Sequence, residues 1–138
     1  MQRAHVEVGG QIVGRIGPGL CVFVGVTHHD GEAEAKHLAA KLWGLRIMDD
    51  ERGVMNVSVA DTTRSLLIVS QFTLYGDAAK GRRPSWIAAA KPDHAEPLIE
   101  LVVHELEAAG ATVATGRFRA EMQVELVNDG PVTLMIEA

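Results

Sequence analysis

The chain has 138 residues, of which 47% are hydrophobic and 22% are charged, and these proportions are typical of a globular protein that can bury a core. Its net charge of −5 argues against a protein that binds nucleic acid non-specifically over its whole surface, although the chain can still carry a local basic patch. A single cysteine, Cys21, excludes an intrachain disulfide, and no apolar stretch resembles a signal peptide or a membrane span. We therefore expect one cytoplasmic domain, residues 1–138, without membrane association.

The first third of the chain is predicted to form short strands separated by glycine turns. Apolar residues alternate or run together in each of these segments, which is typical of strands. From residue 32 to residue 44 the apolar residues instead recur at helical spacing, and Asp30 is the expected N-cap of this helix. Strands are predicted at residues 4–8, 11–16, 20–26, 45–48 and 54–59.

The second half of the chain contains the best candidate for a central strand, residues 65–72, because its apolar run implies burial on both faces. A loop over residues 73–85 is followed by a helix that begins at the capping box Asp93-His94-Ala95-Glu96 and ends at Gly110. Two closing strands are predicted at residues 122–127 and 132–136. The order of elements favours an α/β single domain of layered β/β/α type, in which barrel-like strands are covered by two main helices.

Three polar side chains, those of Ser70, Gln71 and Thr73, stand at the end of the otherwise apolar central strand. Burial of hydroxyl and amide groups costs free energy unless each group is paired or used. Since a layered fold opens at the ends of its strands, these residues are candidates for a site. Hydroxyl groups that are simply hydrogen-bonded where the strand leaves the core explain the pattern equally well.

A second polar cluster gathers three cations and an aromatic residue in one short loop: Lys80, Arg82, Arg83 and Trp86. Phosphate or an RNA end would suit such a cluster, although a solvated loop is the commoner explanation. His28 and His29 lack the spacing of metal ligands, so we expect no metal. The chain also lacks a phosphate-binding P-loop and the G-x-S-x-G elbow of serine hydrolases.

The segment Asn128-Asp129-Gly130-Pro131 stiffens a turn close to the last residues. The first three residues are sufficient for a hairpin turn, whereas Pro131 fixes its own φ angle and restricts Gly130 as well. Taken alone, the segment is most simply a rigid turn.

Taken together, Ser70-Gln71-Phe72-Thr73-Leu74 and Asn128-Asp129-Gly130-Pro131-Val132-Thr133 resemble the paired signature of the D-aminoacyl-tRNA deacylases. Gly81-Arg82-Arg83-Pro84-Ser85 and Thr115-Gly116-Arg117-Phe118 are similar to further stretches of that family. The resemblance extends from Arg3 to the end of the chain, and the order and spacing of both motifs make it specific.

The resemblance implies a homodimer in which a cis Gly130–Pro131 peptide enters the active site of the partner subunit and contacts the chiral centre of the substrate. The substrate would be an ester between a D-amino acid, and also glycine, and the 3′ end of tRNA. Ser70, Gln71, Phe72 and Thr73 would be the catalytic residues, with the backbone amides of Gln71 and Phe72 binding the oxyanion and the Thr73 hydroxyl meeting the ester. The family is thought to rely on these amides and on the 2′-hydroxyl of the RNA, so we expect no cofactor.

Two rival interpretations stay open at this point. Thr73 could act as a covalent nucleophile, although an internal threonine without an activating base is poor in this role. The chain could also be a module that binds an RNA end or a nucleotide without catalysis, through Arg82, Arg83 and Trp86.

One feature departs from the family pattern. The family carries an arginine in a longer first strand that steadies the Gly-Pro loop, whereas Arg3-Ala4 here matches a later Arg-Ala pair. Either the start site is misplaced or another group supports this loop.

Overall fold

The computed structural model describes residues 1–138. Twelve elements follow one another along the chain: β1 (Arg3–Val8), β2 (Gln11–Ile16), β3 (Gly19–Val24), α1 (Glu32–Gly44), β4 (Met48–Asp49), β5 (Met55–Val57), η1 (Val59–Asp61), β6 (Ser65–Ser70), η2 (Phe72–Tyr75), α2 (Pro92–Ala108), β7 (Val113–Thr115) and β8 (Gln123–Val127). Both η elements are short 3-10 helices. No helix is both long enough and apolar enough to cross a membrane.

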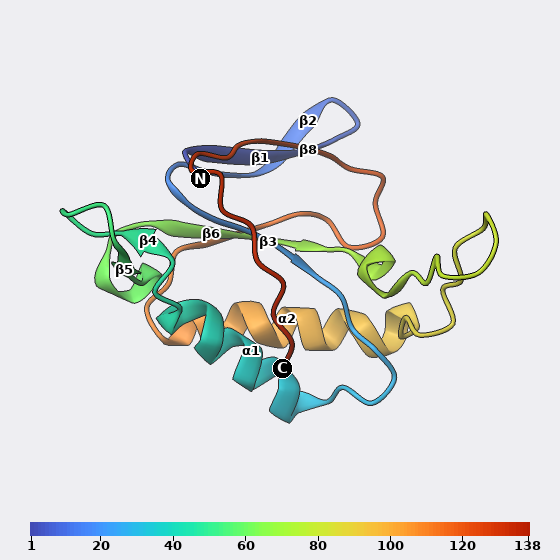
Figure 1. Ribbon diagram of the computed structural model, residues 1–138. Helices are drawn as coiled ribbons and strands as arrows, with labels where there is room; N and C mark the ends of the chain where they lie inside the picture. The colour runs from blue at the N-terminus through green and yellow to red at the C-terminus, as the bar shows by residue number, and fades with distance from the viewer.

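Two three-stranded sheets lie face to face, and the two long helices cover the outer face of one of them (Figure 1). The first sheet has the order β2-β1-β8 with antiparallel pairing, and the second has the order β3-β6-β7 with parallel pairing. Strands β4 and β5 form a separate small hairpin. The α/β single-domain prediction is therefore confirmed at this level, and the two sheets remain separate ladders within the chain.

Strand β6 is the centre of the fold because its side chains fill the core on both faces. Leu66 and Ile68 pack towards the helices, in a cluster with residues of α1 and α2. Leu67 and Val69 point the other way and pack against Val6 of the first sheet. The four side chains are at most 2% exposed, so burying them contributes roughly 1.5–3 kcal/mol each by transfer from water. The prediction of a strand buried on both faces is confirmed.

Both long helices lie where the sequence predicts them, but their N-caps differ from the prediction. Gly31 is the N-cap of α1, because the Asp30 carboxylate instead accepts a hydrogen bond from the Thr27 N–H at 2.9 Å. The Glu34 carboxylate accepts the Gly31 N–H at 2.8 Å, and this bond lowers the pKa of Glu34. Helix α2 begins at Pro92 rather than after Asp93, since proline is well suited to the first helical position, where no N–H is needed.

The prediction of a closing strand at residues 132–136 is wrong. After the Gly-Pro turn the chain leaves the first sheet and crosses in front of β3 to α1 (Figure 1), where Ile136 packs against the core. No neighbouring strand of the same chain is available to this segment. Strand β7, which has three residues, and the 3-10 helix η2 inside the predicted loop were not predicted from the sequence. The strands predicted at 45–48 and 54–59 are shorter than expected.

Candidate functional site

The polar residues at the end of β6 lie at the edge of the sheet, as expected. Ser70 is the last residue of the strand and is half-buried, whereas Phe72 and Thr73 lie in η2 and are exposed. The backbone N–H of Gln71 donates to the Val24 carbonyl at 2.8 Å, which extends the pairing of β6 with β3 by one residue. The strand therefore holds the start of η2 in a fixed position.

The Gln71 backbone amide is consequently not free to bind an oxyanion, and that part of the sequence-based assignment is wrong. The Phe72 and Thr73 amides, by contrast, begin the 3-10 helix and have no partner within it. The Gln71 side chain donates a hydrogen bond from Nε2 to the Thr73 Oγ1. A hydroxyl that accepts one hydrogen bond still has its own proton to donate, so Thr73 can donate outward.

Tyr75 is the titratable residue at the end of η2. Burial raises the pKa of its phenol, and the nearby carboxylates of Asp30 and Glu137 raise that pKa further. The phenol is therefore neutral near pH 7, and it can act there as a hydrogen-bond donor or acceptor but not as a base.

A cavity of about 210 Å³ adjoins Ser70. Its walls come from the end of β6, from one face of α2 and from the segment after β7. The lining residues are Ile68, Ser70, Glu96, Ile99, Glu100, Val103, His104, Thr115, Gly116 and Phe118. The contribution of α2 to this cavity could not be predicted, because the helical spacing of its residues indicates only which face of the helix is apolar. The cavity therefore has a mixed lining of apolar, polar and charged side chains directly beside the candidate catalytic strand.

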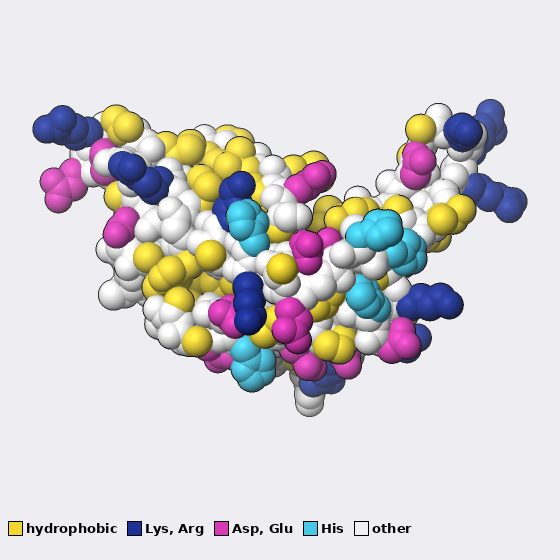
Figure 2. Space-filling model, turned by 90° about the horizontal axis from the view of Figure 1, so that it is seen from below, with side chains coloured by type: hydrophobic (Ala, Val, Ile, Leu, Met, Phe, Trp, Pro, Cys, Tyr) yellow, Lys and Arg dark blue, Asp and Glu magenta, His cyan; other side chains and the backbone are white.

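The basic cluster lies on a projecting arm, residues 76–86, at the same end of the molecule as η2 (Figure 1). Two backbone hydrogen bonds between Asp77 and Ser85, at 2.8 and 2.7 Å, close the base of the arm. Lys80, Arg82 and Arg83 are exposed, and Figure 2 shows Lys and Arg side chains at the tip of the arm. The structure therefore brings the three cations together and leaves them accessible.

Trp86 has a structural contact that its place in the sequence does not indicate. Its ring packs edge-on against Phe72, with centroids 5.5 Å apart, and a Cβ at Gly76 would overlap it. Trp86 therefore joins the arm to η2, and it remains partly exposed.

The segment that follows the arm is held by residues of the β3–α1 connection. The Thr27 hydroxyl donates to the Ala88 carbonyl and the His28 Nε2 meets the Ile87 carbonyl, each at 2.6 Å. The Ala90 N–H donates in turn to the Val26 carbonyl at 2.9 Å. These residues position the arm, and no spacing pattern in the sequence indicates this. The chain has no group of three potential metal ligands.

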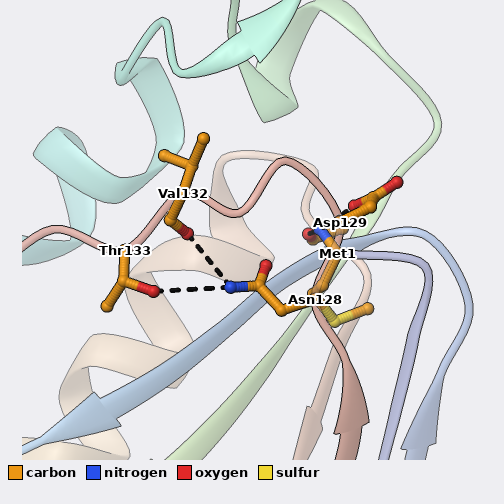
Figure 3. Close-up of polar contacts among 6 residues, drawn as sticks. Met1, Asn128, Asp129, Val132 and Thr133 are labelled. Carbon is orange, nitrogen blue, oxygen red and sulfur yellow. Dashed lines mark hydrogen bonds and ion pairs between the residues drawn. The ribbon is translucent and has the colours of Figure 1, made fainter.

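The loop that contains Gly130 and Pro131 is exposed, and its Gly-Pro peptide is cis. The Asn128 side chain spans the turn, donating to the Val132 carbonyl and to the Thr133 hydroxyl at 3.4 Å each (Figure 3). Asp129 lies 3.6 Å from the Met1 ammonium group. In this structure these contacts, rather than an arginine, hold the loop.

The two motifs lie at opposite ends of β6. Val127, just before the loop, accepts a hydrogen bond from the Gln2 N–H, and Gly19 pairs with Met1. Gly19 in turn is in register with Ser65, the first residue of β6. Ser70 ends the same strand, and five residues of strand span roughly 17 Å. A single chain therefore does not bring its Gly-Pro loop to its own Ser70 and Thr73.

Comparisons of the sequence identify close relatives. The family model described as D-Tyr-tRNA(Tyr) deacylase matches residues 1–137. The D-aminoacyl-tRNA deacylase of Heliobacterium modesticaldum is 58% identical over 135 residues, which cover 98% of this chain and 90% of the relative. That of Streptomyces coelicolor is also 58% identical, over 97% of this chain and 92% of the relative.

Solved structures share the fold. A structure named c-Myc DNA Unwinding Element Binding Protein is similar with a TM-score of 0.93 and 36% identity, over 99% of this chain and 93% of that chain. A probable eukaryotic D-amino acid tRNA deacylase is similar in fold, with a TM-score of 0.79 and 19% identity over 95% and 91% of the two chains. With the whole-chain match and the curated relatives, these findings confirm the family predicted from the two motifs: the chain belongs to the D-Tyr-tRNA(Tyr) deacylase family, whose members are hydrolases.

Proposed function

We propose that this protein hydrolyses the ester between a D-amino acid and the 3′ end of tRNA, and so removes wrongly charged tRNA from translation in the cytoplasm. The family match supports the hydrolytic reaction and its substrate, and the separation of the two motifs along β6 supports an active site shared between two chains. Each motif is incomplete within one chain, and a second copy of the chain would supply the missing half. The active site is then formed by Ser70–Thr73 of one subunit and Gly130-Pro131 of the other.

The proposed chemistry needs a water nucleophile and donors for the oxyanion. The Phe72 and Thr73 amides supply these donors, while the Gln71 side chain orients the Thr73 hydroxyl. Thr73 does not act as a covalent nucleophile in this scheme, because its hydrogen-bond partner, the carboxamide group of the Gln71 side chain, cannot take up a proton as a base would. No cofactor or metal enters the reaction.

A symmetric homodimer is supported by exposed apolar residues near the Gly-Pro loop. Leu134 and Met135 follow this loop in sequence and are 55% and 83% exposed, and the backbone at 132–136 pairs with no strand of the chain. Exposed apolar side chains and backbone groups that are left unpaired within the chain are both features of protein interfaces. A two-fold symmetric dimer would cover the exposed apolar side chains of both copies at once and would bring the Gly-Pro loop of each chain to the other chain.

The Gly130-Pro131 backbone would distinguish the D from the L configuration of the substrate amino acid. If the loop carbonyl groups hold the amino group of the substrate, a side chain of L configuration points into the loop backbone and one of D configuration points away. Selectivity then comes from excluding the wrong hand. Glycine has no side chain to exclude, so the glycyl ester is a substrate as well.

Incubation of the protein with D-, L- and glycyl-tRNA tests the proposed function. The enzyme accelerates release of the D-amino acid and of glycine and leaves the L ester at its spontaneous rate. A binding module without catalysis, the alternative suggested by the basic arm, would slow the release of all three. Equal acceleration of the D and L esters would contradict the role of the Gly130-Pro131 loop in chiral selection.

The basic arm gives a prediction about the RNA. The double substitution Arg82→Ala and Arg83→Ala should weaken tRNA binding and reduce the slope of log affinity against log salt by about two, because each lost phosphate contact removes about one unit. Filter binding of tRNA between low and moderate salt measures both quantities.

The matched control removes two cations from the exposed face of α1, Lys36→Ala with Lys41→Ala, and changes the net charge equally. This control should retain the wild-type slope. If the arm variant also retained it, the RNA would follow another path.

A further inference from the structure

The segment between β7 and β8 contains a turn in which an arginine occupies a position that favours glycine. The Ala120 N–H donates to the Arg117 carbonyl at 3.1 Å, which closes a four-residue turn. Arg119 is its third residue and has a φ angle of +63°, the single positive φ among the non-glycine residues. The third position of a type II turn requires such an angle and is usually filled by glycine or asparagine, because a Cβ makes it unfavourable.

This turn borders the candidate active site. The Gly116 N–H donates to the Ile68 carbonyl at 3.1 Å, two residues before Ser70. Gly116 and Phe118 line the cavity beside Ser70, and Phe118 also packs against the cluster around Ala95. The buried side of the turn is therefore anchored to the core at the edge of the cavity.

The exposed side of the turn carries unpaired positive charge. Arg117 and Arg119 are both exposed, and the ion pairs of the chain involve only Met1 and His5 with carboxylates. The opposite wall of the cavity, on α2, carries Glu96 and Glu100. A phosphate near the cavity would consequently be attracted to the turn and repelled from the helix.

We propose that Arg119, on the outer side of this turn, binds a backbone phosphate of the tRNA 3′ end as the ester enters beside Ser70. The inference deepens the proposed function, because it takes tRNA as the substrate. It assigns a second phosphate-binding position, in a segment of the chain separate from the basic arm. The unfavourable φ angle of Arg119 is then retained because the guanidinium group at this position binds the phosphate. Strained backbone angles tend to concentrate at functional sites.

The substitution Arg119→Gly relieves the backbone strain and removes the charge together, and two measurements report the two effects: the melting temperature reports the strain, and RNA binding reports the charge. Thermal stability should rise by about 3 °C, since glycine adopts a positive φ freely. The KM for D-aminoacyl-tRNA should rise about 5- to 10-fold with kcat nearly unchanged, and the salt slope of RNA binding should fall by about one. Arg119→Lys keeps both charge and strain and should retain the wild-type slope and melting temperature.

A fluorescent RNA hairpin with a single-stranded 3′ end, without an amino acid, provides the binding measurement. This probe reports on the turn even if the chain hydrolyses no D-aminoacyl ester, so the failure of the inference and that of the proposed function are distinguishable. Lys36→Ala, on the exposed face of α1, is the control for the loss of one positive charge. Wild-type RNA affinity and salt slope in Arg119→Gly would overturn the inference, whichever way the melting temperature moved.

Discussion

Replacement of Gly130 by alanine is expected to reduce hydrolysis of D-aminoacyl-tRNA at least about 100-fold, because a small displacement in an active site has an effect of this size. Gly130 has a φ angle of +116°, which residues with a side chain rarely adopt, and an added Cβ would lie 3.1 Å from Val132. The loop must therefore shift, and with it the backbone that would contact the chiral centre.

The same substitution should change the stability of the fold little, because Gly130 is exposed and the loop can relax into solvent. Gly110→Ala is the matched control, since Gly110 has a φ angle of +109° and lies at the end of α2, outside both motifs. It should lower the melting temperature at least as much and leave the activity intact. Wild-type hydrolysis of the D ester by Gly130→Ala, with the L ester still spared, would show that this loop is only a turn.

The substitution Thr73→Val should lower kcat by about 10²- to 10³-fold, because it removes the hydroxyl that donates to the reacting ester, and loss of one such preorganised donor usually has an effect of this size. Valine has nearly the shape of threonine but no hydroxyl, and it also leaves the Gln71 side chain without its acceptor. The melting temperature should stay within a degree or two, because Thr73 is exposed.

Thr73→Ser retains the hydroxyl and should keep most of the activity. Mass spectrometry of enzyme quenched during turnover should detect no amino acid attached to Thr73, since water is the proposed nucleophile. A Thr73→Val variant with the wild-type kcat would exclude the hydroxyl from the reaction. A covalent adduct on Thr73 would instead support the nucleophile mechanism.

The central part of the fold could be predicted from the sequence because its signals are local. Four consecutive apolar residues between Ser65 and Ser70 are sufficient to indicate a strand buried on both faces, and the helical spacing from residue 32 to residue 44 determines α1. Segment 132–136 has an equally good strand pattern and still has no partner within the chain. The preference of the side chains indicates that a segment can form a strand, but not whether a neighbouring strand is present to pair with it.

The sequence singles out the residues of the candidate site, whereas it does not indicate how they are arranged in space. The two motifs identify Ser70 to Thr73 and Gly130-Pro131, yet their separation along β6 follows from the antiparallel pairing of β8 with β1, which involves residues far apart in the sequence. The backbone N–H of Gln71 was wrongly assigned as a donor to the oxyanion for a related reason. Its bond to Val24 is a backbone contact between strands, and no side-chain motif reports it.

Subunit complementation tests most directly the central claim, that two chains together form each active site. Gly130→Ala and Thr73→Val chains with different affinity tags are co-expressed, and the heterodimers are purified through both tags. In each heterodimer one site pairs the intact Thr73 of one chain with the intact Gly130 of the other, so about half of the wild-type activity should return. If each site were built within one chain, both sites would carry a defect. A heterodimer as inactive as the two parent variants, or a failure to recover any heterodimer, would contradict the account.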